Sequence, residues 1–106
     1  MRTFPRSLAA FRQMVEERGK RLRALSFAEL ERLTRAPSQE SVSVDGRPAT
    51  ITTTVERWPD GTLRVVLRGL MKPRYLPFGH DVAMDGFYKH SNGSVTPMAD
   101  REFNEF

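Results

Sequence analysis

The sequence has no cysteine, so it can form no disulfide bond, offers no thiolate nucleophile and supplies no cysteine ligand to a metal. No hydrophobic run approaches the roughly 18 residues that a transmembrane helix requires. The segment Met1–Arg6 leads into a charged stretch without the apolar run of a signal peptide. Together these absences predict a cytoplasmic protein that does not enter a membrane.

Signatures of particular chemistry are missing as well. The seven glycines build neither a phosphate-binding loop nor a dinucleotide fingerprint. The serines lie in expected caps, turns and strand faces rather than in a nucleophile elbow. The sequence therefore favours a non-catalytic protein over an enzyme, and it predicts no cofactor.

What the sequence does contain is enough for one folded domain, over residues 1–106. Its 39% of hydrophobic and 28% of charged residues are typical of a globular protein, and 106 residues suffice for one core but not for two. Residues 1–35 hold nine lysines and arginines against four glutamates, a net charge of +5, whereas residues 36–106 carry a net charge of −1. A basic first third can favour nucleic acid or an acidic partner.

The first third is expected to begin with an amphipathic helix. From Ser7, a candidate cap, to about Arg23, apolar residues recur at helical spacing on one stripe, formed by Leu8, Phe11, Val15, Leu22 and Leu25. Gly19 falls on the same side, where it costs about 1 kcal/mol relative to alanine. It therefore indicates either a close backbone approach or a break in the helix.

A second, short helix is predicted directly after the first. Ser26 and Glu29 have the spacing of a capping box, in which each side chain bonds the backbone N–H of the other residue. The helix should stop before Pro37, because proline disfavours helical geometry in the residue that precedes it. Residues 1–36 thus form an elbow of two helices.

From Ser41 the periodicity changes to two, which predicts antiparallel strands over 41–97. Asp45-Gly46 closes a first hairpin, and a second turn spans 58–62. The expected registers pair Val44 with Arg47, Val42 with Ala49, Val55 with Val65, Thr53 with Leu67 and Glu56 with Arg64. In these registers both hairpins place their aliphatic residues on one face of the sheet.

The resulting fold is a two-layer α+β domain. The helical elbow packs on one face of an antiparallel meander of about three strands, and a C-terminal hairpin follows. Short strands are expected at 82–84 and 86–90, and the second of them turns at Ser91-Asn92-Gly93. The other sheet face should be polar, and residues 98–106 form a tail that carries Phe103 and Phe106.

Histidines and acidic residues form one candidate site. His80, Asp81, Asp85 and His90 could hold a metal or perform acid–base chemistry, which makes a small hydrolase or metal enzyme one alternative. Their spacing matches no metal-binding pattern, and Asp85-Gly86 is better explained as a turn. The sequence therefore predicts no metal site here.

A basic cluster on the first helix is a second candidate. Arg18, Lys20, Arg21 and Arg23 could contact phosphates, together with Arg64 and Arg68 on the polar sheet face, which makes a nucleic-acid-associated protein another alternative. Glutamates four residues before Lys20 and Arg21 partly neutralise the cluster. A solvated helical face is the simpler interpretation.

The polar sheet face and the aromatic residues near it form the third candidate. Aromatic side chains and arginines are typical interface anchors. Equally, Tyr75 and Phe78 could fold inward and close the open end of the core, since a small domain does not easily leave many large aromatic residues in water. The residues proposed to bind a partner are Trp58, Arg64, Arg68, Lys72, Arg74, Tyr75 and Phe78. The leading hypothesis is a non-catalytic interaction or accessory protein that binds a protein partner or forms a homo-oligomer.

Overall fold

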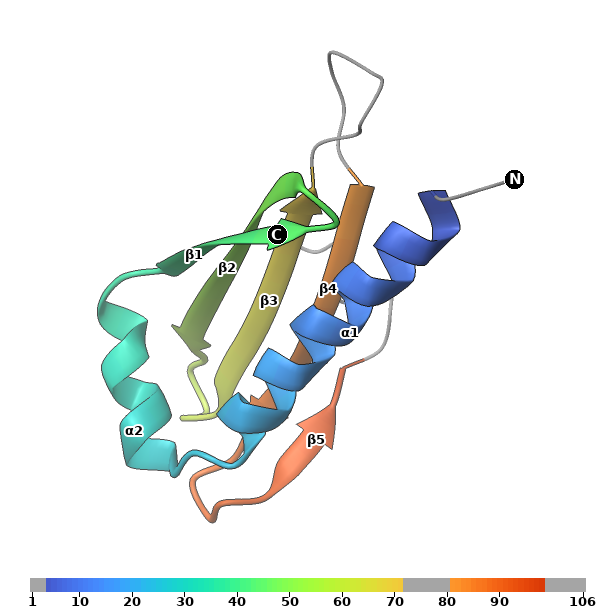
Figure 1. Ribbon diagram of the computed structural model, residues 1–106. Helices are drawn as coiled ribbons and strands as arrows, with labels where there is room; N and C mark the ends of the chain where they lie inside the picture. Colours follow the sequence, from blue (N-terminus) through green and yellow to red (C-terminus); the bar gives the residue numbers. More distant parts are fainter. Residues whose placement is uncertain (1–3, 72–80, 99–106) are drawn as a thin grey trace.

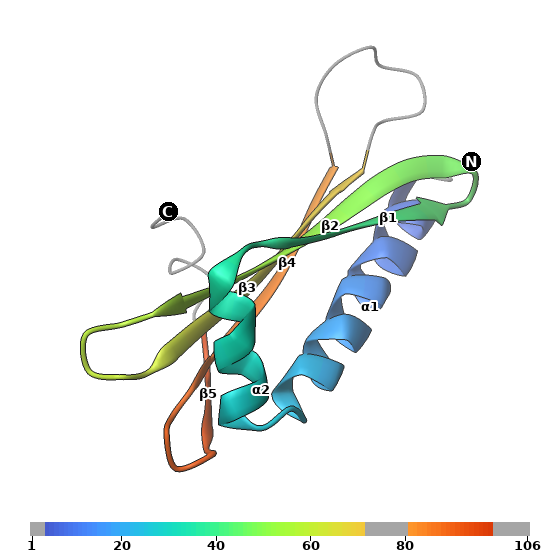
Figure 2. The same ribbon diagram turned by 90° about the vertical axis from the view of Figure 1, so that its left-hand side faces the viewer.

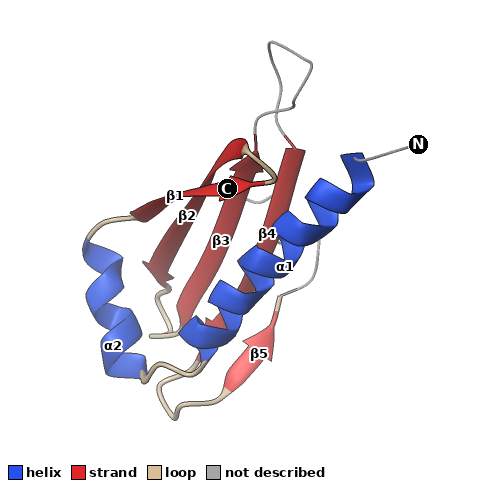
Figure 3. Ribbon diagram, viewed as in Figure 1, coloured by secondary structure: helices blue, strands red, loops and turns tan. Residues whose placement is uncertain are grey.

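The computed structural model describes residues 4–71 and 81–98. Helix α1 (Phe4–Arg23) and helix α2 (Phe27–Arg32), which ends in the 3-10 turn η1 (Leu33–Arg35), precede every strand. The strands are β1 (Ser38–Val44), β2 (Arg47–Arg57), β3 (Leu63–Met71), β4 (Asp81–Lys89) and β5 (Val95–Pro97). They form one antiparallel sheet in chain order, and both helices lie on the same side of it (Figures 1, 2 and 3). The predicted α+β class is confirmed.

The helices form largely as their sequence predicts. The capping box of α2 is present, with the Glu29 N–H donating to Ser26 Oγ and the Ser26 N–H donating to Glu29 Oε1. Helix α1 begins three residues earlier than predicted, so Ser7 lies inside its first turns. Ser7 is buried there and donates its hydroxyl to Asp45 Oδ2 at 2.9 Å. The expectation that Ser7 caps the helix was therefore wrong.

The predicted registers of the first three strands are confirmed. Val44 pairs with Arg47, and the partners of Val42, Thr53, Val55 and Glu56 are those expected. Asp45 and Gly46 adopt positive φ values of 50° and 76° in the first turn, where glycine and aspartate are favoured. Strand β1 begins at Ser38 rather than Ser41.

The last two strands differ from the prediction. Residues 81–89 form one continuous strand instead of two short ones, because each residue pairs with β3 from Met71 to Leu63. Asp85-Gly86 therefore lies in the middle of β4, and its interpretation as a turn was wrong. The C-terminal hairpin is present, and it extends the same sheet through the pairing of β5 with β4.

The core lies between the sheet and the helices, and α1 packs over β3 and β4. Phe11 and Val15 of the predicted stripe are completely buried, whereas Leu22 and Leu25 pack at its margin. Gly69 on β3 makes room for the aromatic ring of α1, since a Cβ there would lie 2.6 Å from Phe11 Cζ. The largest fully buried side chains are Phe11, Phe87, Leu30, Ile51, Leu63, Leu67, Met71, Val15 and Val65.

No described helix covers the opposite side of the sheet, which we call the open face. It carries the expected threonines and arginines of β2 and β3, but β3 and β4 also place apolar residues there, namely Val66, Leu70, Val82 and Met84. The face is therefore less polar than predicted. Lys72, Arg74, Tyr75 and Phe78, and the tail phenylalanines, lie outside the described residues.

Candidate functional site: an aromatic hollow on the open face

Trp58 follows the last residue of β2 and is held in place by a tight turn. Its N–H donates to the carbonyl of Thr62 and its carbonyl accepts from the Gly61 N–H, both at 2.8 Å. Gly61 has a φ of 90°, a conformation that favours glycine. The turn thus fixes the backbone of Trp58 while its side chain stays 39% exposed.

The indole of Trp58 packs against the ring of Tyr88, which belongs to β4. Their ring centroids are 5.3 Å apart and their planes meet at 66°, an edge-to-face arrangement. The sheet register explains the meeting. Glu56 on β2, Arg64 on β3 and Tyr88 on β4 lie side by side across the sheet. Trp58 follows Glu56 by two residues, so its side chain lies on the same face and extends across β3 to Tyr88.

These two rings form part of the wall of a hollow with a volume of about 290 Å³. The other four lining residues come in pairs: Asp60 and Thr62 belong to the turn after β2, and His90 and Thr96 belong to the β4–β5 hairpin. The lining residues are Trp58, Asp60, Thr62, Tyr88, His90 and Thr96. We call this site the Trp58 hollow.

The polar groups of the Trp58 hollow are held by local hydrogen bonds. The Thr62 N–H donates to Asp60 Oδ1 at 2.9 Å and lowers the pKa of Asp60, so this carboxylate is ionised at neutral pH. His90 Nε2 lies 2.6 Å from Thr96 Oγ1. Among the described residues the lining contains one carboxylate and neither lysine nor arginine.

A carboxylate beside the hollow orients the indole. Trp58 Nε1 donates to Glu56 Oε1 at 3.4 Å, and the same oxygen lies 3.7 Å from Arg64 Nη1. The side chain of Arg64 is only 5% exposed, so its charge is matched by Glu56 rather than displayed to solvent. The proposed binding residue Arg64 thus supports the site from below, while Arg68 is exposed farther along β3.

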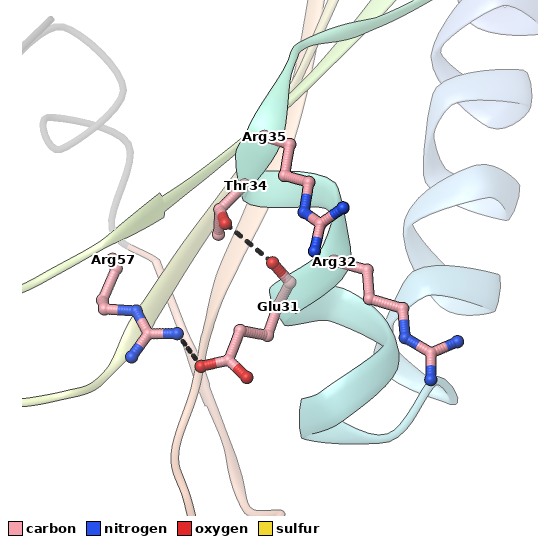
Figure 4. Close-up of a pocket in the computed structure, with 5 residues that line it drawn as sticks. All are labelled: Glu31, Arg32, Thr34, Arg35 and Arg57. Carbon is pink, nitrogen blue, oxygen red and sulfur yellow. Dashed lines mark hydrogen bonds and ion pairs between the residues drawn. The ribbon is translucent and has the colours of Figure 1, made fainter.

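A second hollow, with a volume of about 270 Å³, lies where α2 and η1 meet the end of β2 (Figure 4). Arg57 of β2 forms an ion pair with Glu31 of α2, and Thr34 Oγ1 donates to the Glu31 carbonyl at 2.7 Å. Arg32 and Arg35 complete the lining. Three arginines against one carboxylate make this arginine hollow opposite in charge to the Trp58 hollow.

Two members of the predicted basic cluster are bound to carboxylates. Arg18 makes two 2.7 Å hydrogen bonds to Glu40 of β1, and Arg23 binds Asp85 of β4. Lys20 and Arg21 are exposed. The cluster therefore displays fewer free positive charges than its sequence indicates.

The predicted histidine and aspartate cluster does not assemble on one face. Asp85 points toward α1, whereas His90 lies on the open face beside Thr96. The side chain of Asp81, and all of His80, lie outside the described residues. Within 4–71 and 81–98, no three histidine or acidic side chains are grouped closely enough to hold a metal ion.

Sequence reasoning named Trp58 but missed the role of Tyr88, Thr96 and Asp60 beside it. The turn at 58–62 was predicted, so the place of Asp60 could have been found from it. Tyr88 and Thr96 reach the site only through the pairing of β4 with β3 and of β5 with β4. Nine residues of chain separate β3 from β4, and no local pattern in them fixes that register.

No described helix is long and apolar enough to cross a bilayer. Comparison of the chain with protein-family models, with curated proteins and with solved structures finds no match.

Proposed function

We propose that this chain is a non-catalytic protein-binding domain whose partner, a different protein, docks on the open face at the Trp58 hollow. The observation that carries the proposal is the indole of Trp58, which is 39% exposed and fixed edge-to-face on Tyr88 above a hollow. Exposed tryptophan and tyrosine supply large contact areas at low cost in side-chain entropy, and they are enriched at the centres of interfaces.

An exposed apolar side chain on the open face supports the same function. Val82 of β4 lies on this face with Tyr88 and is 43% exposed, so the face offers an apolar contact besides Trp58. A partner that covers Trp58 and Val82 would bury apolar surface and replace water over the sheet. The absence of cysteine fits a protein that works in the cytoplasm.

Binding of nucleic acid receives less support from the contacts of the basic residues. Arg18 and Arg23, two of the four proposed phosphate ligands, already make charge-assisted hydrogen bonds to carboxylates. Trp58 and Tyr88 stand edge-to-face, whereas successive bases stack on rings that offer free faces in a row. A protein partner is therefore the better proposal.

A photo-crosslinking amino acid placed at Arg68, which is exposed on the open face, tests this function in cells of the source organism. Gln13, which is exposed on α1 on the opposite side of the molecule, is the control position. We expect one defined protein to crosslink at residue 68 and not at residue 13, and this crosslink to be lost when Trp58→Ala is added. Equal capture at both positions, no capture, or capture of a second copy of this chain would each overturn the proposal.

A further inference from the structure

We propose that the Trp58 hollow is a receptor for a positively charged side chain, so that the partner presents an arginine or a lysine to it. The inference rests on the proposed function for the existence of a protein partner, and it adds the chemistry by which that partner is recognised.

The aromatic walls suit a cation. A guanidinium or ammonium group is attracted to the face of an aromatic ring within about 6 Å of its centre, and tryptophan gives the strongest attraction. Because Trp58 and Tyr88 meet at 66°, the two rings form a corner instead of stacking on each other. The hydrogen bond from Trp58 Nε1 to Glu56 holds the indole in place before a ligand arrives.

The charge of the hollow points to the same ligand. Asp60 supplies a carboxylate, and the described lining holds no arginine or lysine; its basic side chain is His90, whose Nε2 lies 2.6 Å from Thr96 Oγ1. Arg64, which pairs with Tyr88 across the sheet, lies 3.7 Å from Glu56 Oε1, so the two charges offset each other. In a chain with a net charge of +4, this is a local site where a cation is attracted instead of repelled.

The arginine hollow provides an internal contrast. Its described lining holds Arg32, Arg35 and Arg57 against the single carboxylate of Glu31, and no aromatic ring, so a cation would be repelled from it. A cationic probe should therefore perturb the Trp58 hollow and leave the arginine hollow unchanged. This difference separates specific binding from a general effect of added salt.

The test uses three small probes with the full chain: N-acetyl-arginine amide, its neutral isostere N-acetyl-citrulline amide, and N-acetyl-proline amide. Binding is followed by ¹H–¹⁵N NMR, in which the indole signal belongs to Trp58 because the chain has one tryptophan. We expect the arginine probe to shift the Trp58, Tyr88 and Thr96 signals, and to bind at least about fivefold more tightly than the citrulline probe.

Asp60→Asn isolates the charge of the carboxylate. Asparagine keeps an oxygen that accepts from the Thr62 N–H, so the turn is retained while the negative charge is lost. Glu16→Gln, at an exposed position of α1, removes the same charge elsewhere. We expect Asp60→Asn to weaken the arginine probe about threefold to fivefold and Glu16→Gln to leave it unchanged.

Four results would overturn the inference: equal binding of the citrulline probe, tighter binding of the proline probe, an equal effect of the two variants, or no shift with any probe. The proposed function can fail separately. If the arginine probe binds the hollow but no partner crosslinks at Arg68, the cation site is supported and the protein-binding function is contradicted. If a partner crosslinks but the citrulline probe binds as tightly as the arginine probe, the protein-binding function is supported and the cation site is contradicted.

Discussion

Arg23 and Asp85 form a two-point ion pair that joins the last turn of α1 to the middle of β4. Arg23 Nη1 lies 2.8 Å from Asp85 Oδ2 and Nη2 lies 3.0 Å from Oδ1, while Nη2 also donates to the Gly86 carbonyl. The guanidinium carbon lies 4.8 Å from the ring centroid of Phe87. Lys89 Nζ donates to the carbonyl of Arg23 at 3.2 Å. Two residues proposed for different functional sites are thus partners that fix the helix on the sheet.

Asp85→Ala is expected to destabilise the fold by about 2 kcal/mol, because it leaves the partly buried Arg23 without its carboxylate. The Asp85 side chain is 17% exposed, whereas that of Glu40, which pairs with Arg18, is 51% exposed. Glu40→Ala should therefore cost no more than about 1 kcal/mol. Urea unfolding measures the free energy of unfolding of both variants. Equal decreases would contradict a structural role for the Arg23–Asp85 pair.

Gly19→Ala should destabilise the protein, although the same change stabilises most helices by about 1 kcal/mol. A Cβ at residue 19 would overlap Asp85 Oδ2 and lie 2.8 Å from Arg23 Nη1, so it would force the ion pair apart. In an Asp85→Ala background the carboxylate is gone and the Arg23 side chain loses the partner that holds it beside Gly19, so Gly19→Ala should then become neutral or stabilising. Urea unfolding of the two single variants and the double variant measures this coupling, and additive effects would refute it.

Local rules made much of the fold predictable. The capping box needs only Ser26 and Glu29, and the first registers follow from an Asp-Gly turn and a period of two. A close approach at Gly19 was one of the two alternatives that the sequence left open, the other being a break in the helix, and α1 is unbroken there. What it approaches was not predictable, since Asp85 lies 66 residues away and its strand had been divided at Asp85-Gly86.

The candidate site was predictable only in part, for a related reason. Trp58 was singled out because an exposed aromatic beside a turn is a typical anchor. The hollow around it needs β4 and β5, and their registers depend on pairing across a long connection. Arg64 was expected on an open polar face, and the structure places it on that face, between Glu56 and Tyr88 in the sheet, but only 4% exposed.

The free energy of unfolding should fall as the pH drops below about 4.5. The backbone N–H of Ser26 lowers the pKa of Glu29, and Arg18 lowers the pKa of Glu40, each below a usual value of 4.5. The Thr62 N–H lowers the pKa of Asp60 below its usual value of 3.8. An acid whose pKa is lower in the folded state binds its proton more readily in the unfolded state, so acid favours unfolding.

Urea unfolding between pH 3 and pH 7 measures this dependence. Glu29→Gln keeps an oxygen for the capping box but cannot titrate, so its curve should be flatter below pH 4.5 than that of the parent chain. Arg12→Gln, at an exposed position of α1, is a control whose curve should keep the parent slope. A parent curve that rises toward low pH would show the opposite linkage and contradict the prediction.

Trp58→Ala should lower the free energy of unfolding far less than the truncation of an aromatic residue in the core. Its side chain is 39% exposed, and its main described contact is the edge-to-face pair with Tyr88, which is worth about 0.5–1.5 kcal/mol. Phe87, one position before Tyr88, is completely buried, and Phe87→Ala should cost about 3–5 kcal/mol. Urea unfolding compares the two variants. A loss at Trp58 as large as that at Phe87 would mean that the indole serves the fold, and exposure at this position would then be no argument for a binding site. A small loss of stability, together with loss of the partner crosslink at Arg68, would separate binding from folding at the Trp58 hollow.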